Sequence, residues 1–269
     1  MALKLMYITN NPRIAQIAER SGVDWIFVDL EKKGKMERQG HLDTVISNHK
    51  ISDIAPLKNI LTMSKLLVRI NPINSDSDKE IIDVIEAGAE IIMLPYFKKK
   101  HEVEDFIKVI NGRVETCLLL ETPEAVDNLD DILQVKGIDY IHIGLNDLHL
   151  GYNMKFMFEL LADGTVEKII KKIKAHNLPY GFGGIAQIGQ GSLPAEKIIA
   201  EHYRLESSMV ILSRTFFNQD KIDDYDIALK TFRDGIQGIR DFEQYLKTRT
   251  GVYFAKNKQD VEKIVKSIV

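Results

Sequence analysis

The sequence predicts an α/β fold in which eight parallel strands close into a (β/α)8 barrel, the TIM-barrel architecture. Three observations lead to this prediction. The length of 269 residues suits one such barrel. Short apolar runs, near-continuous rather than alternating, are typical of strands that are covered on both faces. Helical patterns separate these runs, and regular alternation of strand and helix favours a parallel sheet.

The eight predicted strands are rich in β-branched or aromatic residues. They are residues 3–8, 25–30, 65–70, 90–96, 115–121, 140–144, 180–184 and 209–215. An open, doubly wound sheet is the alternative, and it usually carries a glycine-rich turn after its first strand. Here the first strand runs into "TNNPR" (residues 9–13), which contains no glycine. The closed barrel is therefore favoured.

The predicted helices have recognisable ends. The first has Asn11 as its N-cap, Pro12 in its first turn and Gly22 as its stop, and the second stops at Gly88. The helical segments are residues 11–22, 77–88, 102–113, 122–134, 164–177, 193–205, 223–246 and 256–269. The sequence shows no linker and no short-period repeat. We therefore expect a single domain spanning residues 1–269, with residues 223–269 as a C-terminal helical extension.

Composition narrows the class of function. The net charge of −3 and the pI of about 6.2 argue against a nucleic acid or an anionic membrane as partner. No stretch reaches the roughly 18 consecutive apolar residues of a membrane span. The N-terminus has neither a long apolar run nor a cleavage-like site, which predicts a cytoplasmic protein. The one cysteine, Cys117, lies in a predicted strand and is expected to be a buried hydrophobic residue, not a nucleophile.

Charged residues are predicted to meet at one end of the barrel, because the active site of this fold lies at the carboxyl ends of the strands. Glu121 ends the fifth strand, Asp147 follows the sixth and Arg69 lies near the end of the third. Two carboxylates suit Mg²⁺ or Mn²⁺, with water and substrate oxygens completing the octahedron. An arginine fork suits carboxylate or keto oxygens.

This set predicts a site that binds a 2-oxo acid and stabilises its enolate. Each residue also has a structural alternative. Glu121 can be a strand-end acid, Asp147 a turn residue and Arg69 the partner of a nearby acid.

A second feature follows the last two strands. Loops in this place in barrels often bind phosphate through backbone N–H groups. Gly183 and Gly184 supply adaptable backbone there, and Arg214 supplies positive charge. These residues predict binding of an anionic or hydroxylated end of the substrate, unless the loop only packs and Arg214 pairs with an acid. His142, in the sixth strand, is expected to be a packed core histidine.

Five sequence blocks in order resemble the HpcH/HpaI aldolases and the citrate lyase beta-subunit group. The blocks are "AERSGVDWIFVDLE", "LLVRINPINSD", "VIEAGAEIIMLPY", "LLLETPEAVDNLDDIL" and "IDYIHIGLNDL", and the resemblance covers residues 17–215. The 26-residue separation of Glu121 and Asp147 matches that family's metal-binding carboxylates.

The resemblance carries several implications. It implies Mg²⁺ or Mn²⁺ held by Glu121 and Asp147, with Arg69 at the substrate oxygens. It also implies that backbone N–H groups from Leu145 through Asn146 to Asp147 receive the substrate carboxylate, and that Gly144 allows a close approach. A homo-oligomer, trimeric or hexameric as in relatives, is implied as well.

The sequence departs from both branches of the family. In the aldolase branch an acid is followed by a histidine base, whereas here Glu31 is followed by Lys32. Glu31 and His41 are therefore further catalytic candidates. His41 could replace the missing base from the same loop, and the alternative is a solvated loop histidine. The pattern around Glu31 looks more like the citrate lyase branch, but that branch has an acid at the position of Lys32. Residues 181–216 fit neither branch closely.

Three hypotheses about function result. The first is a metal-dependent carbon–carbon lyase, an aldolase that forms or cleaves a pyruvate-like enolate from a 2-oxo acid and an aldehyde, with a sugar-derived or phosphorylated substrate as one form. The second is a citrate-lyase-like enzyme acting on an acyl-CoA. The third is a non-catalytic barrel that binds a small acid.

Overall fold

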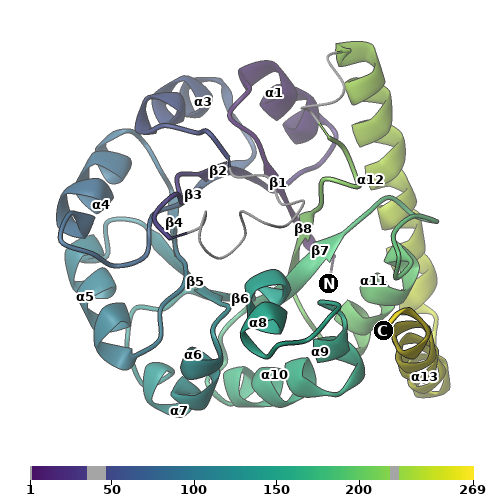
Figure 1. Ribbon diagram of the computed structural model, residues 1–269. Helices are drawn as coiled ribbons and strands as arrows, with labels where there is room; N and C mark the ends of the chain where they lie inside the picture. Colours follow the sequence, from purple (N-terminus) through teal and green to yellow (C-terminus); the bar gives the residue numbers. More distant parts are fainter. Residues whose placement is uncertain (1, 35–46, 219–223) are drawn as a thin grey trace.

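The eight strands form a closed barrel of parallel strands in sequence order, as predicted (Figure 1). The computed structural model describes residues 2–34, 47–218 and 224–269. The strands are β1 (Lys4–Ile8), β2 (Trp25–Asp29), β3 (Lys65–Arg69), β4 (Ile91–Leu94), β5 (Glu115–Leu120), β6 (Tyr140–Ile143), β7 (Tyr180–Ile185) and β8 (Met209–Leu212). β1 pairs with β8, which closes the barrel.

Helix ends follow the chemistry expected from the sequence. Asn11 caps α1 (Pro12–Arg20), and its side chain accepts hydrogen bonds from the backbone N–H groups of Arg13 and Ile14. Thr122 caps α6 (Pro123–Asp127) in the same way. The helix predicted over residues 122–134 is two pieces, α6 and α7 (Leu129–Ile132), because Asn128 between them has a non-helical backbone.

The remaining helices surround the barrel. They are α3 (Ile54–Ile60), α4 (Ser77–Glu86), α5 (Lys100–Ile110), α8 (Leu145–Gly151), α9 (Glu159–Ala162), α10 (Thr165–Ala175), α11 (Ala195–Arg204), α12 (Tyr225–Lys247) and α13 (Gly251–Ile268), with a 3₁₀ turn at Ile51–Asp53. α3, α8 and α9 were not predicted, because they are too short for a clear apolar period. α13 begins at Gly251, five residues before the predicted start.

Two apolar layers hold the fold. One fills the barrel interior and the other lies between the strands and the helices. Cys117 belongs to the interior layer, and burial raises the pKa of its thiol. This environment makes it inert, as expected from its place in a strand.

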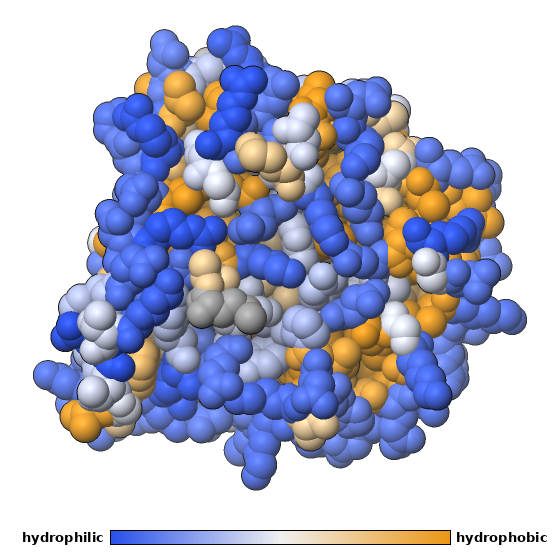
Figure 2. All heavy atoms as spheres, turned by 180° about the vertical axis from the view of Figure 1, so that it is seen from behind, coloured by the Kyte–Doolittle hydropathy of each residue, from blue (hydrophilic) through white to orange (hydrophobic). Residues whose placement is uncertain are grey.

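The C-terminal helices pack against the outer ring. α12 lies against α1, and α13 lies against α11 and α9 (Figure 1). Figure 2 shows the opposite face of the molecule, where hydrophilic side chains surround separate patches of hydrophobic ones. Among the described residues, no helix is long and apolar enough to cross a membrane.

Candidate active site

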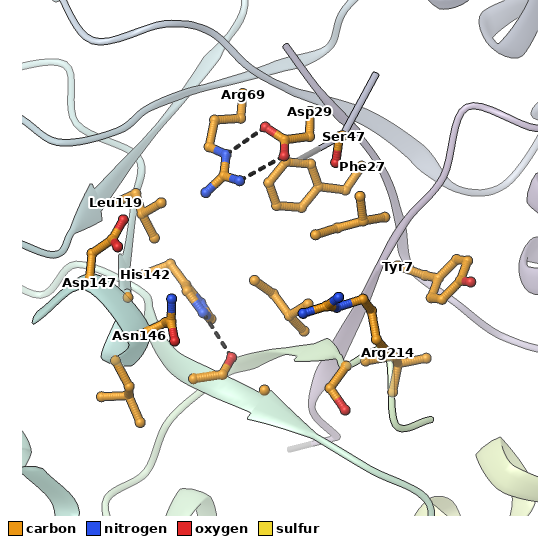
Figure 3. A pocket seen from close by; sticks show the side chains of 18 of the residues that line it. Tyr7, Phe27, Asp29, Ser47, Arg69, Leu119, His142, Asn146, Asp147 and Arg214 are labelled. Atoms are coloured by element: carbon orange, nitrogen blue, oxygen red, sulfur yellow. Dashed lines mark hydrogen bonds and ion pairs between the residues drawn. The ribbon is translucent and has the colours of Figure 1, made fainter. Parts of the chain in front are cut away.

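A cavity of about 700 Å³ opens at the carboxyl ends of the strands, where the sequence placed the site. Arg69, Glu121 and Asp147 all line it, and so do Gly183 and Arg214 from the last two strands. Figure 3 shows Arg69 and Asp147 at the cavity wall, with Arg214 extending toward the middle from the opposite side. The fold therefore brings together charged groups that lie far apart in the sequence.

Glu121 and Asp147 are both nearly buried, with 4% and 8% of their surface exposed. The backbone N–H of Tyr96 donates to Glu121 Oε1 over 3.1 Å. Tyr96 has φ of 51°, a left-handed conformation that costs a bulky residue of order 1–3 kcal/mol and often marks functional sites. The chain end of β4 is therefore shaped to hold this carboxylate in one orientation.

Gly144 is required by its contact with Glu121. A Cβ atom at position 144 would lie 2.8 Å from both Cβ and Oε2 of Glu121, closer than real Cβ contacts allow. α8 begins directly after this glycine, and Asn146 and Asp147 lie in its first turn, not in an open turn. The glycine thus allows the end of β6 and the Glu121 carboxylate to approach.

Arg69 is held by two acids. Its Nε and Nη2 donate to the two carboxylate oxygens of Asp29 over 2.9 and 2.8 Å, and its Nη1 lies 3.4 Å from Glu31 Oε2. Burial by itself disfavours the guanidinium charge, but the charges of Asp29 and Glu31 outweigh this effect and raise the pKa of Arg69. Arg69 therefore has two roles: it is the ion-pair partner of the two acids, and it places a fixed positive charge on the cavity wall.

The candidates for proton transfer lie in different places. Glu31 is fully buried against Arg69 and is not among the residues that line the cavity. His41 lies outside the described residues. His49, which the sequence reasoning missed, lines the cavity and accepts the backbone N–H of Asp29 at Nδ1 over 3.0 Å. In a neutral ring this hydrogen bond leaves the proton on Nε2.

The β7–β8 side of the cavity is built from backbone and one arginine. Gly183 has φ of 56°, and the register of β7 against β8 shifts between Gly181 and Gly184. Arg214 is exposed at the cavity, two residues after the end of β8. Gly183, Gly184 and Arg214 are thus brought together as predicted, and Leu145 and Asn146 face the same space.

His142 is buried, as predicted, but it also lines the cavity. Its Nε2 lies 3.1 Å from the backbone oxygen of Gly183. Burial, with a smaller contribution from the charge of Arg69, lowers the pKa of His142 to about 4. The ring is therefore neutral at physiological pH.

The donor set fits a divalent cation that the protein holds through few ligands. No group of three His, Cys, Asp or Glu side chains suited to an ion occurs in the part of the chain that the structure describes. Mg²⁺ and Mn²⁺ are commonly bound by one or two carboxylates plus water and substrate oxygens. Glu121 and Asp147, two buried carboxylates on one cavity, supply that number.

The barrel carries a charged cavity at the carboxyl ends of its strands, which is the place of the active site in enzymes of this fold. Comparison with known proteins specifies the family. The family described as HpcH/HpaI aldolase/citrate lyase matches residues 4–178. The chain belongs to this family. The 2-keto-3-deoxy-L-rhamnonate aldolase of Escherichia coli K12 is 27% identical over 207 residues, which cover 64% of this chain and 71% of the relative. The protein of the same name from Shigella dysenteriae is also 27% identical over the same shares.

Solved structures show the same fold at low identity. An HpcH/HpaI aldolase from Desulfitobacterium hafniense superposes with a TM-score of 0.63 at 17% identity, covering 79% of this chain and 86% of that one. The citrate synthase SbnG gives a TM-score of 0.59 at 19% identity, covering 79% and 87%. RipC from Yersinia pestis gives 0.58 at 13% identity, covering 93% and 97%.

The family and its aldolase relatives make this protein a lyase of the aldolase type, acting on small molecules. The family generally depends on a divalent metal ion. These findings favour an enzyme over the non-catalytic barrel.

Proposed function

We propose that the protein cleaves or forms a carbon–carbon bond next to a pyruvate-like enolate, acting on a hydroxylated 2-oxo acid. One observation carries this proposal: two buried carboxylates and a fixed arginine face one cavity. The named relatives act, by their names, on 2-keto-3-deoxy-L-rhamnonate, a sugar-derived 2-oxo acid. The same substrate class fits a cavity of about 700 Å³.

Glu121 and Asp147 would hold the divalent cation, Mg²⁺ or Mn²⁺. The cation, when bound, acts as a Lewis acid that favours negative charge on the keto oxygen of the substrate. The N–H of Tyr96 and the absence of a side chain at Gly144 keep the Glu121 carboxylate in place. Leu145 and Asn146, at the start of α8, line the cavity. Their backbone is proposed to bind the substrate carboxylate.

Arg69 is proposed to stabilise the negative charge that develops on the substrate oxygens. Its fork is already oriented by Asp29 and Glu31, so no reorganisation is needed when the charge appears. Glu31 then acts through Arg69 as a positioning residue, because it is buried behind the guanidinium and does not line the cavity.

Proton transfer is assigned to the β2 side of the cavity. His49 presents Nε2–H when its ring is neutral, so it is suited to donate a hydrogen bond to a substrate oxygen and so to stabilise the negative charge that develops there. His41, from the same connection between β2 and α3, stays the candidate for the group that accepts a proton.

Arg214 and the glycines of β7 are proposed to receive the far end of the substrate. Arg214 stands across the cavity from Asp147 (Figure 3). Its charge favours an anionic or heavily hydroxylated end, with or without a phosphate. The substrate would then be larger than pyruvate plus a simple aldehyde.

Exchange of the methyl protons of pyruvate tests the proposed chemistry without knowledge of the aldehyde. In D₂O with Mg²⁺ or Mn²⁺, the protein should remove the methyl signal of pyruvate in proton NMR, and EDTA should stop the loss. Activity that resists EDTA and is trapped by borohydride would show a lysine Schiff base and would refute the proposal.

We also propose that residues 1–269 form one domain that acts in the cytoplasm as a homo-oligomer. The packing of α12 on α1 and of α13 on α11 supports the single domain. The trimer or hexamer is supported by the family resemblance, and light scattering on the purified protein tests it through the mass of the particle.

A further inference from the structure

His142 occupies an unusual place on the wall of the cavity. In the sheet it stands opposite Leu119 of β5 on one side and Gly181 of β7 on the other. The His142 ring therefore has the side chain of Leu119 beside it on β5, whereas Gly181 on β7 has no side chain. It points into the barrel and lines the cavity near Asn146 (Figure 3).

The hydrogen bond to β7 fixes which ring nitrogen carries the proton. A carbonyl oxygen can only accept, so His142 Nε2 must donate to the backbone oxygen of Gly183 over 3.1 Å. The left-handed backbone of Gly183 and the irregular register of β7 accompany this contact. Since burial keeps the ring neutral, Nδ1 bears a lone pair and can only accept a hydrogen bond.

Nδ1 of His142 has no partner. It is buried, and no hydrogen-bond donor reaches it from the residues that the structure describes. Buried polar atoms in native proteins are nearly always paired, so an unpaired one beside a functional cavity points to a partner bound there. The ring that carries this unpaired acceptor lines the cavity.

The chemistry of the substrate restricts what can pair with this acceptor. The carboxylate and keto oxygens of a 2-oxo acid are acceptors themselves, and so are the ionised oxygens of a phosphate. A donor must come from a hydroxyl group. In the proposed reaction such hydroxyl groups belong to the aldehyde-derived part of the substrate.

We infer that His142 is a specificity-determining residue whose Nδ1 accepts a hydrogen bond from a hydroxyl of the aldehyde portion, so that the enzyme prefers hydroxyaldehydes to their deoxy analogues. This inference rests on the proposed function. His142 does not transfer a proton in this scheme, because its ring stays neutral and acts as an acceptor only. A site built to pair with a hydroxyl rejects the analogue that lacks it, since its own polar atom is then left buried and unpaired.

Two substitutions separate the two ring nitrogens. His142→Gln places an amide N–H near the position of Nε2, so the bond to Gly183 can persist while the acceptor at Nδ1 is lost. His142→Asn places an amide oxygen near the position of Nδ1, so the acceptor persists while the bond to Gly183 is lost. His101→Gln, on the exposed face of α5, is the matched control.

The experiment measures aldol addition of pyruvate to glyceraldehyde and to propanal with Mn²⁺, as the ratio of the two kcat/KM values. The wild-type protein and His101→Gln should favour glyceraldehyde. His142→Gln should lower that ratio by roughly 5- to 150-fold, the range for one lost hydrogen bond to a buried group. His142→Asn should retain most of the preference.

Other outcomes overturn the inference. An equal rate with both aldehydes in the wild-type protein would refute it, and so would a ratio that His142→Gln leaves unchanged. Equal loss in both variants would make His142 a structural residue.

If a variant fails to fold, ¹⁵N NMR of the histidine-labelled wild-type protein decides. The Nδ1 resonance of His142 should shift on addition of glyceraldehyde with pyruvate and not with propanal, and the absence of that difference overturns the inference. If the wild-type protein does not exchange the methyl protons of pyruvate, the proposed function is refuted instead.

Discussion

The two sides of the cavity are built in opposite ways. On the β2–β3 side, Arg69 is fixed by hydrogen bonds and ion pairs to Asp29 and Glu31, and both of these acids are buried. On the β7–β8 side, glycines form the wall and Arg214 is exposed to solvent. A fixed charge suits stabilisation of a charge that develops at one place. An adaptable backbone with an exposed arginine suits substrates of varying length. We therefore assign chemistry to the first side and selectivity to the second.

The largest effect is expected from Glu121 and Asp147, the two carboxylates that we propose hold the metal ion. Glu121→Gln and Asp147→Asn should each lower pyruvate exchange by roughly 10³-fold or more, because the Lewis acid contributes several kcal/mol. Glu124→Gln, three residues further on the exposed surface of α6, is the matched control and should exchange normally. Mn²⁺ affinity measured by electron paramagnetic resonance checks the cause. Wild-type affinity in both variants would place the ion elsewhere.

Arg69→Lys tests whether the fixed side of the cavity depends on geometry or on charge alone. Lysine keeps the charge but loses the planar fork that Asp29 orients. The rate of exchange should fall roughly 30- to 1000-fold, or about 2–4 kcal/mol in the transition state. Thermal melting shows whether the fold survives. Near-normal kinetics in a stable variant would mean that Arg69 serves only the ion pair.

His142, on the β6–β7 side of the cavity, is expected to make the free energy of unfolding depend on pH. Its pKa is about 4 in the folded protein and about 6.5 as a free side chain, so below pH 6.5 the unfolded chain binds the extra proton. The free energy of unfolding should therefore fall as the pH drops from 6.5 to 4, by roughly 3 kcal/mol from this residue.

Denaturant titrations at several pH values measure this slope. In His142→Phe the total fall in the free energy of unfolding between pH 6.5 and 4 should be smaller by roughly 3 kcal/mol. In His101→Gln it should match the wild-type protein. An unchanged slope in His142→Phe would show that the ring is not held neutral.

Arg214→Ala is expected to have the smallest effect and to divide the two sides of the cavity most clearly. Loss of one charge-assisted hydrogen bond should raise KM for a phosphorylated or acidic aldehyde by roughly 10- to 100-fold. Pyruvate exchange should change far less, because the enolate site is built on the opposite wall. If exchange collapses while selectivity for long substrates persists, Arg214 belongs to the catalytic centre or to the fold.

The fold was predictable because each strand is a short apolar run and each long helix has a clear start and stop. The acids and Arg69 were predictable because a barrel brings strand ends together, so a position in sequence becomes a position in space. Residues 251–255 carry no clear signal for the start of a helix, so the start of α13 could not be predicted from the sequence. The helix packs on α11 and α9.

Contacts between separate connections could not be predicted in the same way. His49 is 20 residues away from Asp29 in the sequence, and no local pattern indicates that its ring accepts the backbone N–H of Asp29. The N–H of Tyr96 on Glu121 depends on a left-handed residue that no propensity favours. The need for glycine at position 144 arises from Glu121, a neighbour in space that is 23 residues away in the sequence. Such contacts are set by tertiary packing.

A diffraction experiment with Mn²⁺ and oxalate, a planar analogue of the pyruvate enolate, tests the central claim most directly. The anomalous signal of manganese locates the ion independently of the protein density. The account predicts one strong peak between the carboxylates of Glu121 and Asp147, with oxalate beside the guanidinium of Arg69. A peak at Asp29 and Glu31 instead, or oxalate bound away from Arg69, would contradict it.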